Sequence, residues 1–142
     1  MVEKEAGTEV ITVDAVMENL KKVLSFVRKK LNETEGDMLS CITLEMVVEE
    51  LYTNIASYAY GKHTGIVTVR CSVKQEPLEL IVTFMDHGIP YNPLEHKDPD
   101  IKAPLEERKT GGNGILMAKK MMDDMQYEFK DGMNILTIRK LV

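Results

Sequence analysis

The chain has 142 residues, of which 44% are hydrophobic, and it carries a formal net charge of −5 at pH 7. A chain of this length can build one adequate core, so we expect a single domain over residues 1–142. The acidic balance, with charges of both signs interleaved, argues against direct binding of nucleic acid. The sequence has no apolar run of membrane-spanning length and no signal-peptide pattern at its start, so we expect a cytoplasmic protein that does not engage a membrane.

The first part of the chain predicts a strand followed by a basic helix. Residues 8–13 are rich in β-branched side chains, which favours a strand. Asp14 is then expected to cap a helix over residues 15–31, in which apolar side chains recur at helical spacing. Basic side chains coat the other side of this helix: Lys21, Lys22, Arg28, Lys29 and Lys30. Such a face is usually solvated, although it could also meet an acidic partner.

A second helix is predicted over residues 37–60, between Gly36 and Gly61. One of its faces is apolar and includes Leu44, Val47, Val48, Leu51 and Ile55. Glu50 and Asn54 are one helical turn apart and fall along one edge of that face. A carboxylate and an amide placed in this way at the margin of a cleft could serve a hydroxyl nucleophile and a metal ion together. The alternative is a solvated polar margin.

Two antiparallel strands are predicted next, over residues 66–73 and 78–85. The second strand is largely apolar on both faces, which indicates a central place in the sheet. Asp86 follows this strand directly, and Gly88 comes two residues later. We therefore expect a carboxylate at the end of a central strand.

A long segment without periodicity follows. It is dense in charge, and it contains Pro93, Pro99 and Pro104. A loop of this length inside a compact domain is either disordered or functional, and functional loops of this kind are commonly lids. The sequence therefore predicts a lid over about residues 91–111.

The last part of the chain predicts a helix over residues 115–124 and strands over 126–130 and 134–141. The helix is expected to direct these side chains inward: Ile115, Ala118, Met121, Met122 and Met125. Asp131-Gly132 between the strands is a strong hairpin signal. The resulting order is β, α, α, β, β, lid, α, β, β. This order predicts a two-layer α/β sandwich with helices on one face of the sheet.

Three motifs occur in a fixed order along the chain: Glu50-x-x-x-Asn54, Asp86-x-Gly88 and Gly111-Gly-x-Gly114. Together they resemble the ATP-binding site of the GHKL superfamily, which includes gyrase, Hsp90, histidine kinases and MutL. The small chain and the variant Asp-x-Gly-x-Pro-(aromatic)-Asn-Pro are similar to the anti-sigma factor serine/threonine kinases. The resemblance covers about residues 42–140. It implies the Bergerat fold, with a mixed, mainly antiparallel sheet and three helices on one face.

The resemblance implies an ATP site in which Asn54 binds Mg²⁺ and Asp86 accepts a hydrogen bond from the adenine amino group. Gly88 would make room for the ring, and Thr137 would support the adenine contact through water. Alternatively, Thr137 is an ordinary threonine of a strand without a role in binding. Pro90 stands where the broader superfamily has glycine, which weakens a gyrase-type interpretation.

The phosphates of ATP would meet glycines and a basic residue. These glycines are Gly111, Gly112 and Gly114, at the start of a helix where backbone N–H groups and the helix dipole favour an anion. An ordinary glycine-rich turn is the alternative. Either Arg108 or Lys109 could neutralise phosphate charge. Glu50 is the expected catalytic base, because a carboxylate near the γ-phosphate can take the proton of an attacking hydroxyl.

The implied function is an ATP-binding anti-sigma factor that regulates transcription. It would phosphorylate an antagonist protein on serine or threonine and also bind a sigma factor. One alternative is a non-catalytic, ATP-dependent binding switch, and another is the ATPase module of a histidine-kinase-like system. The intact Glu50 favours the kinase, since a pure switch needs no base. A homodimer is also possible, with residues 9–13 as an available strand edge.

Overall fold

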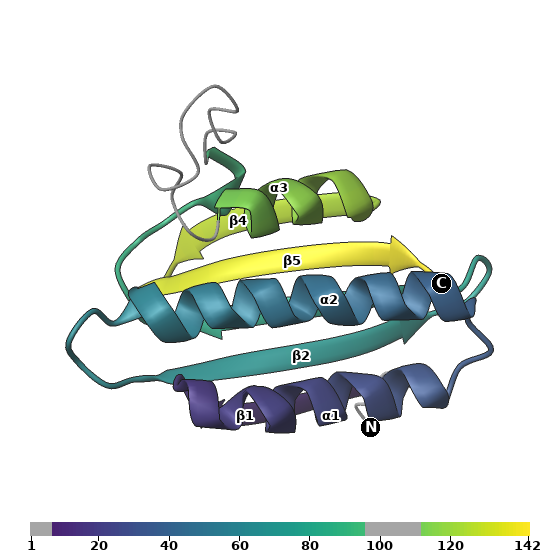
Figure 1. Cartoon of the computed structure of the whole chain (residues 1–142), viewed down its shortest axis with the longest axis horizontal. Helices are drawn as coiled ribbons and strands as arrows, with labels where there is room; N and C mark the ends of the chain where they lie inside the picture. The colour runs from purple at the N-terminus through teal and green to yellow at the C-terminus, as the bar shows by residue number, and fades with distance from the viewer. Residues whose placement is uncertain (1–6, 96–111) are drawn as a thin grey trace.

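The protein, a computed structural model, is described over residues 7–95 and 112–142. Its sheet has five strands in the order β1-β2-β3-β5-β4: β1 (Thr8–Asp14), β2 (Ile66–Lys74), β3 (Glu79–Asp86), β4 (Asp124–Lys130) and β5 (Met133–Leu141). Three helices cover one face of this sheet: α1 (Leu20–Asn32), α2 (Met38–Asn54) and α3 (Gly112–Met121) (Figure 1). The predicted two-layer α/β sandwich is thus confirmed. Every strand pairing in the described part is antiparallel, where the resemblance implied a mixed sheet.

The central strand of the sheet is β3, as its two apolar faces predict. It pairs with β2 on one side and β5 on the other, and its last residue, Asp86, stands between Val67 and Asn134. Side chains alternate between the two faces of a strand. Asp86 therefore shares the helix-covered face with Phe84 and Val82, which are buried in the core. This register brings Asp86 and Asn134 together beneath α2.

The core lies between the helices and this face of the sheet. Fully buried apolar side chains come from α1, α2 and the three middle strands, and include Val23, Val27, Leu44, Val47, Val48, Leu51, Val69, Leu80, Val82 and Ile138. Cys71 lies among them as a free thiol, and its burial raises its pKa to about 12. None of the helices in the described ranges is both long enough and apolar enough to cross a membrane.

The start of α1 differs from the prediction. Asp14 does not cap a helix: it ends β1, the backbone of Val16 is still extended, and a 3-10 turn over Met17–Asn19 precedes α1. The hydroxyl of Tyr52 explains the delay, because it lies 3.2 Å from the carbonyl oxygen of Asp14 and donates to that of Val16 at 2.7 Å. A tertiary contact from α2 thus holds this segment extended.

Lys30 also differs from the prediction of a basic solvated face. It is only 4% exposed, and its Nζ lies 3.7 Å from a carboxylate oxygen of Glu33 and 3.9 Å from one of Glu9. The long aliphatic stem of a lysine can cover apolar surface while the ammonium group reaches carboxylates at the margin. The other predicted basic residues of α1 are exposed: Lys21, Lys22, Arg28 and Lys29.

The second predicted helix is present, with a change of winding near its end. Asp37 caps α2 by accepting a hydrogen bond from Ser40 N at 3.0 Å. After Asn54 the helix continues as a π-helix, η2 (Ile55–Ala59). Such π-turns inside helices often occur at functional sites.

Residues around the predicted lid and third helix are only partly described. The lid, predicted for about 91–111, lies mostly outside the described residues, which show a 3-10 turn η3 (Pro93–Glu95) at its start. The helix α3 begins at Gly112, three residues before the predicted start, and ends at Met121. Met125 belongs to β4 instead, and Met121 is exposed although it was predicted to face inward.

Candidate functional site

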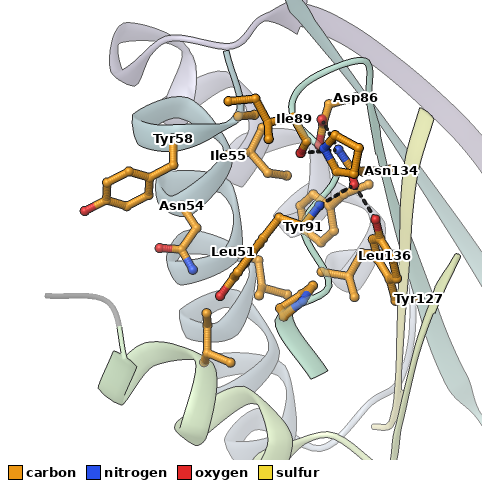
Figure 2. Close-up of a pocket in the computed structure, with 15 residues that line it drawn as sticks. Leu51, Asn54, Ile55, Tyr58, Asp86, Ile89, Tyr91, Tyr127, Asn134 and Leu136 are labelled. Atoms are coloured by element: carbon orange, nitrogen blue, oxygen red, sulfur yellow. Dashed lines mark hydrogen bonds between the residues drawn. The ribbon is translucent and has the colours of Figure 1, made fainter. Parts of the chain in front are cut away.

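A cavity of about 620 Å³ opens between the C-terminal part of α2, the segment after β3 and the paired ends of β3, β5 and β4 (Figure 2). Its lining is mainly apolar, with a few polar groups: Leu51, Asn54, Ile55, Tyr58, Ala59, Phe84, Asp86, Ile89, Pro90, Tyr91, Pro93, Ile115, Tyr127, Asn134 and Leu136. Pockets for small organic ligands typically have this size and this mixture of apolar walls and a few polar groups.

Asp86 supplies the buried carboxylate of this cavity and is only 4% exposed. Its Oδ1 accepts two hydrogen bonds, from Gly88 N at 2.9 Å and from Asn134 Nδ2 at 3.0 Å. Its Oδ2 accepts none from the residues that the structure describes. One carboxylate oxygen is therefore fixed by the protein, and the other is available to a donor from a ligand.

Asn134 is a site residue that the sequence did not reveal. Its Nδ2 also donates to Ile89 O at 3.0 Å, and its Oδ1 accepts from Tyr91 N at 3.0 Å and from Tyr127 OH at 2.5 Å. Figure 2 shows these bonds converging on the Asn134 amide between the two tyrosines and Asp86. This one side chain therefore joins Asp86 to the backbone of the following segment and to β4. Burial raises the pKa of the Tyr127 hydroxyl, which favours its protonated, donating form.

Thr137 is not brought together with Asp86. It pairs with Thr83 in the register of β3 and β5, with the two hydroxyl oxygens 3.4 Å apart. Because Thr83 and Asp86 are an odd number of residues apart in one strand, their side chains lie on opposite faces of the sheet. The residue that shares the face and register of Asp86 is Asn134.

The turn after β3 is fixed to the end of the second helix. A Cβ at Gly88 would overlap the backbone carbonyl of Ala59, and Ile89 N donates to that carbonyl oxygen at 2.7 Å. The hydroxyl of Tyr60 accepts from His87 N at 2.8 Å and donates to Ile66 O at 2.5 Å. Gly88 is thus needed for close packing against the π-helical turn, which holds the cavity-lining segment in place.

Glu50 and Asn54 lie on α2, as predicted. Asn54 lines the cavity, and Glu50 is one turn earlier, where its carboxylate lies against Gly114. A Cβ at Gly114 would come within 2.9 Å of the Glu50 carboxyl carbon, so any larger residue there would make the Glu50 side chain shift. The structure thus brings Glu50, Asn54 and the first turn of α3 to one place.

The remaining predicted residues are only partly described. Gly112 is the first residue of α3, whereas Arg108, Lys109 and Gly111 lie outside the described residues. Tyr58 lines the rim of the cavity and is largely exposed, with its ring directed away from Asp86 in Figure 2.

Comparison with known families gives a match over most of the chain. The family described as the histidine kinase-like ATPase domain matches residues 13–140. Among curated proteins, the serine-protein kinase RsbW of Bacillus cereus is 28% identical over 95 residues, which cover 66% of this chain and 59% of RsbW. The serine/threonine-protein kinase BtrW of Bordetella bronchiseptica is 27% identical over 97 residues, covering 68% of this chain and 67% of BtrW. The chain thus aligns with less than two thirds of the RsbW length.

Solved structures show the same fold. The crystal structure of the RsbU and RsbW domains of Rv1364c from Mycobacterium tuberculosis superposes with a TM-score of 0.65 and 16% identity, over 93% of this chain and 31% of that one. The histidine kinase domain of a blue-light activated histidine kinase from Erythrobacter litoralis gives a TM-score of 0.54 and 18% identity, over 87% of this chain and 59% of that one. At these identities the likeness concerns the fold alone.

Proposed function

Because the chain belongs to the family of histidine kinase-like ATPase domains, we propose that it is an ATP-binding anti-sigma factor with serine/threonine protein kinase activity. Its substrate would be an antagonist protein, and its second partner a sigma factor, within a partner-switching system. The similarity to RsbW and BtrW, both named as protein kinases, supports this choice within the family.

One observation carries the proposal: a single apolar cavity connects Asp86 at one end with Asn54 at the other, one turn from Glu50. A nucleotide needs a polar contact for its base, apolar walls for the ring and polar groups for its phosphates. The cavity provides these features in that order, from Asp86 through the apolar walls to Asn54. Its lining therefore fits ATP better than a ligand that is charged throughout.

Asp86 would bind the adenine base at its end of the cavity. Its free Oδ2 can accept a hydrogen bond from the exocyclic amino group, while Gly88 N and Asn134 hold Oδ1 in place. Because a buried carboxylate with a free acceptor needs a donor, a base that presents a carbonyl oxygen there would be disfavoured. Asp86 is therefore the residue that we propose selects adenine over other nucleobases.

The phosphate end would lie near α3 and Asn54. The first N–H groups of α3, from Gly112 on, have no partner within the helix and are suited to an anion. The Asn54 side chain can offer its oxygen to Mg²⁺, which needs few protein ligands. A bound Mg²⁺ would neutralise phosphate charge during transfer. Gly111, and either Arg108 or Lys109, would contact the phosphates, as the sequence predicts; these residues lie outside the described ranges.

Glu50 would act as the general base. Its carboxylate can take the proton of a serine or threonine hydroxyl as that oxygen attacks the γ-phosphorus atom. The absence of a side chain at Gly114 lets α3, and hence its phosphate-facing turn, approach this carboxylate closely. The base and the phosphate site would then be adjacent.

The test is phosphoryl transfer from labelled ATP to candidate antagonist proteins encoded beside this chain. Glu50→Gln should bind ATP as the parent does and lower the transfer rate by about 10²–10⁴-fold, the usual contribution of a general base. Glu49→Gln is the matched control, because Glu49 is the exposed neighbour on the same helix and its change should leave the rate unaltered. Asp86→Asn should instead weaken ATP binding itself.

Two outcomes would contradict the proposal. Transfer by Glu50→Gln at the parental rate removes Glu50 as the base. A parent that transfers no phosphoryl group, yet binds a candidate partner only with ATP present, would be a non-catalytic switch.

A further inference from the structure

The outward face of α2 is apolar over its first half. Four side chains there are exposed, Met38 by 76%, Leu39 by 71%, Ile42 by 47% and Met46 by 51%. We call these four residues the α2 patch. Further along the same outward face the residues are polar, namely Glu49, Thr53 and Ser57. The apolar exposure is therefore confined to the end of α2 that lies away from the Asn54 cavity.

This exposure is unusual for the position of α2. Figure 1 shows α2 between α1 and α3 in front of the sheet, so its back and both flanks are covered. A helix that is apolar all round is normally buried on every side. Methionine, which is polarisable and conformationally adaptable, is often used at surfaces that bind other proteins. The bare fourth side of α2 therefore has the composition of an interface.

The two flanking helices give this surface its charge. The whole of α1 contains five basic residues and no acidic one, and α3 ends in Lys119-Lys120 without an acidic residue. Lys29 on α1 and Lys120 on α3 are exposed, and Lys29 makes no ion pair among the described residues. In a chain whose net charge is −5, these basic residues are concentrated on the two helices that border the α2 patch.

The packing of the helices places these groups at the same level. Arg28 of α1 bonds Glu45 of α2 at 2.7 Å, so Lys29 lies beside the first half of α2. Gly114 of α3 contacts Glu50, and α3 runs antiparallel to α2. Lys120 is six residues, or about 9 Å, further along α3 and is therefore level with the part of α2 between Ile42 and Met46. Basic residues thus flank the α2 patch on both sides.

We propose that the α2 patch and its basic borders form a docking surface for an acidic amphipathic helix of a partner protein. The apolar stripe of that helix would cover Leu39 and Ile42, and its acidic residues would face Lys29 and Lys120. This inference depends on the helix surface alone and stands whether or not the chain is a kinase.

Charge distinguishes this occupant from two others. A second copy of the chain would bring basic borders against basic borders, which opposes association. An anionic bilayer would meet Asp37 and Glu49, which are exposed at the two ends of the patch along α2, as well as the negative net charge. A helix that carries acidic residues only on its two flanks can place them over Lys29 and Lys120, and its apolar stripe then lies along the line of Asp37 and Glu49 on α2.

The probe is a synthetic peptide of about 18 residues, or five helical turns. It carries leucines at i, i+3, i+4 and i+7 and glutamates on both flanks of that stripe. We expect saturable binding to the full chain by fluorescence anisotropy, weakening as salt rises. A matched peptide with lysines in place of the glutamates should not bind.

The variants locate the binding. Leu39→Glu with Ile42→Glu should weaken it by about tenfold or more, as for residues at the centre of an interface. Val10→Glu makes the same kind of change at an exposed apolar residue on the other face of the sheet, and should have no effect. Lys29→Glu with Lys120→Glu should also weaken binding and reduce its salt dependence, whereas Lys62→Glu, in an exposed loop, should not.

Three results would overturn the proposal. The first is a dissociation constant for the peptide weaker than about 100 μM, that is, a binding free energy smaller in size than about 5.5 kcal/mol. Peptide binding that both double variants leave unchanged would count equally against the proposal. The second is binding to vesicles of phosphatidylcholine and phosphatidylserine that Leu39→Glu with Ile42→Glu abolishes, which would assign the patch to a membrane. The third is a dimer of the parent, seen by sedimentation equilibrium, that the same variant dissociates.

Discussion

The Asn134 side chain donates a hydrogen bond of 3.0 Å to Asp86 Oδ1 from the neighbouring strand, and both residues are almost fully buried. The same amide holds the backbone at Ile89 and Tyr91. The position of the Asp86 carboxylate and the shape of the cavity wall therefore depend on one residue of the last strand.

We expect Asn134→Ala to destabilise the fold by about 1–3 kcal/mol, because it leaves buried hydrogen-bonding groups without partners. ATP binding should weaken by about tenfold, since Asp86 loses the donor that fixes Oδ1. Urea unfolding and calorimetric titration with ATP measure the two effects. Thr137→Val is the comparison, since Thr137 is on the other face of the sheet. A loss of ATP affinity in Thr137→Val but not in Asn134→Ala would support the role that the family resemblance implies for Thr137.

A second prediction concerns the contact between Gly114 and Glu50. Gly114→Ala should lower the free energy of unfolding by up to about 1 kcal/mol, because the added methyl group overlaps the Glu50 carboxylate and makes that side chain move aside. The Glu50→Ala variant lacks the overlapping carboxylate, so Gly114→Ala should lower its free energy of unfolding much less. The double-mutant cycle, measured by urea unfolding, gives the coupling energy directly. Equal costs in the two backgrounds would show that α3 does not approach Glu50 in solution.

The Tyr60 hydroxyl supports the turn after β3 through two backbone groups. Tyr60→Phe should lower the free energy of unfolding by about 0.5–1.5 kcal/mol, because His87 N and Ile66 O lose this partner and bind water instead. Tyr58→Phe is a matched control two residues away, at an exposed hydroxyl, and should change stability by less than about 0.5 kcal/mol. Similar thermal unfolding of the two variants would argue against the role assigned to Tyr60.

The stability of the protein should depend on Cys71 at alkaline pH. The folded-state pKa of this thiol is about 12, raised by burial from 9.0. The unfolded chain therefore loses the thiol proton first, and stability should fall as the pH rises from 9 towards 12, by at most about 1.4 kcal/mol per pH unit. Below pH 9 the thiol is protonated in both states and contributes no slope.

Cys71→Val isolates this contribution, because valine is apolar and similar in size. Its unfolding free energy, measured in urea at pH 8 and pH 10.5, should fall less than that of the parent. Parallel pH profiles for the two proteins would refute the assignment. In the native parent at pH 8, Cys71 should also resist thiol reagents.

The sequence predicted those parts of the site that local pattern determines. Glu50 and Asn54 follow from the helical repeat, Asp86 from the end of a central strand, and Gly114 from a glycine motif before a helix. Asn134 could not be found in this way, because residues 87–132, which include α3 and β4, separate β3 from β5. Their register depends on packing across that gap. The family resemblance implied a role for Thr137, whose side chain lies on the opposite face of the sheet from Asp86.

Tertiary contacts explain the other differences. The predicted cap at Asp14 has suitable local chemistry, but the Tyr52 hydroxyl holds the backbone there extended. The charge of Lys30 predicts a solvated side chain. Its aliphatic stem nevertheless packs inward, and its ammonium group reaches Glu9, which is distant in sequence. Neither contact can be inferred from the residues that neighbour Asp14 or Lys30 in the sequence.

The order of the strands has a consequence for biosynthesis. Asp86 and its partner Asn134 are 48 residues apart, and Asn134 lies in β5, which leaves the ribosome after the other described strands of this sheet. A nascent chain can fold α1, α2 and the β2–β3 hairpin while one side of β3 is still open, but Asp86 then lacks its cross-strand donor. The cavity is complete only after the C-terminal hairpin has docked, so nucleotide could not assist the folding of the earlier elements during translation.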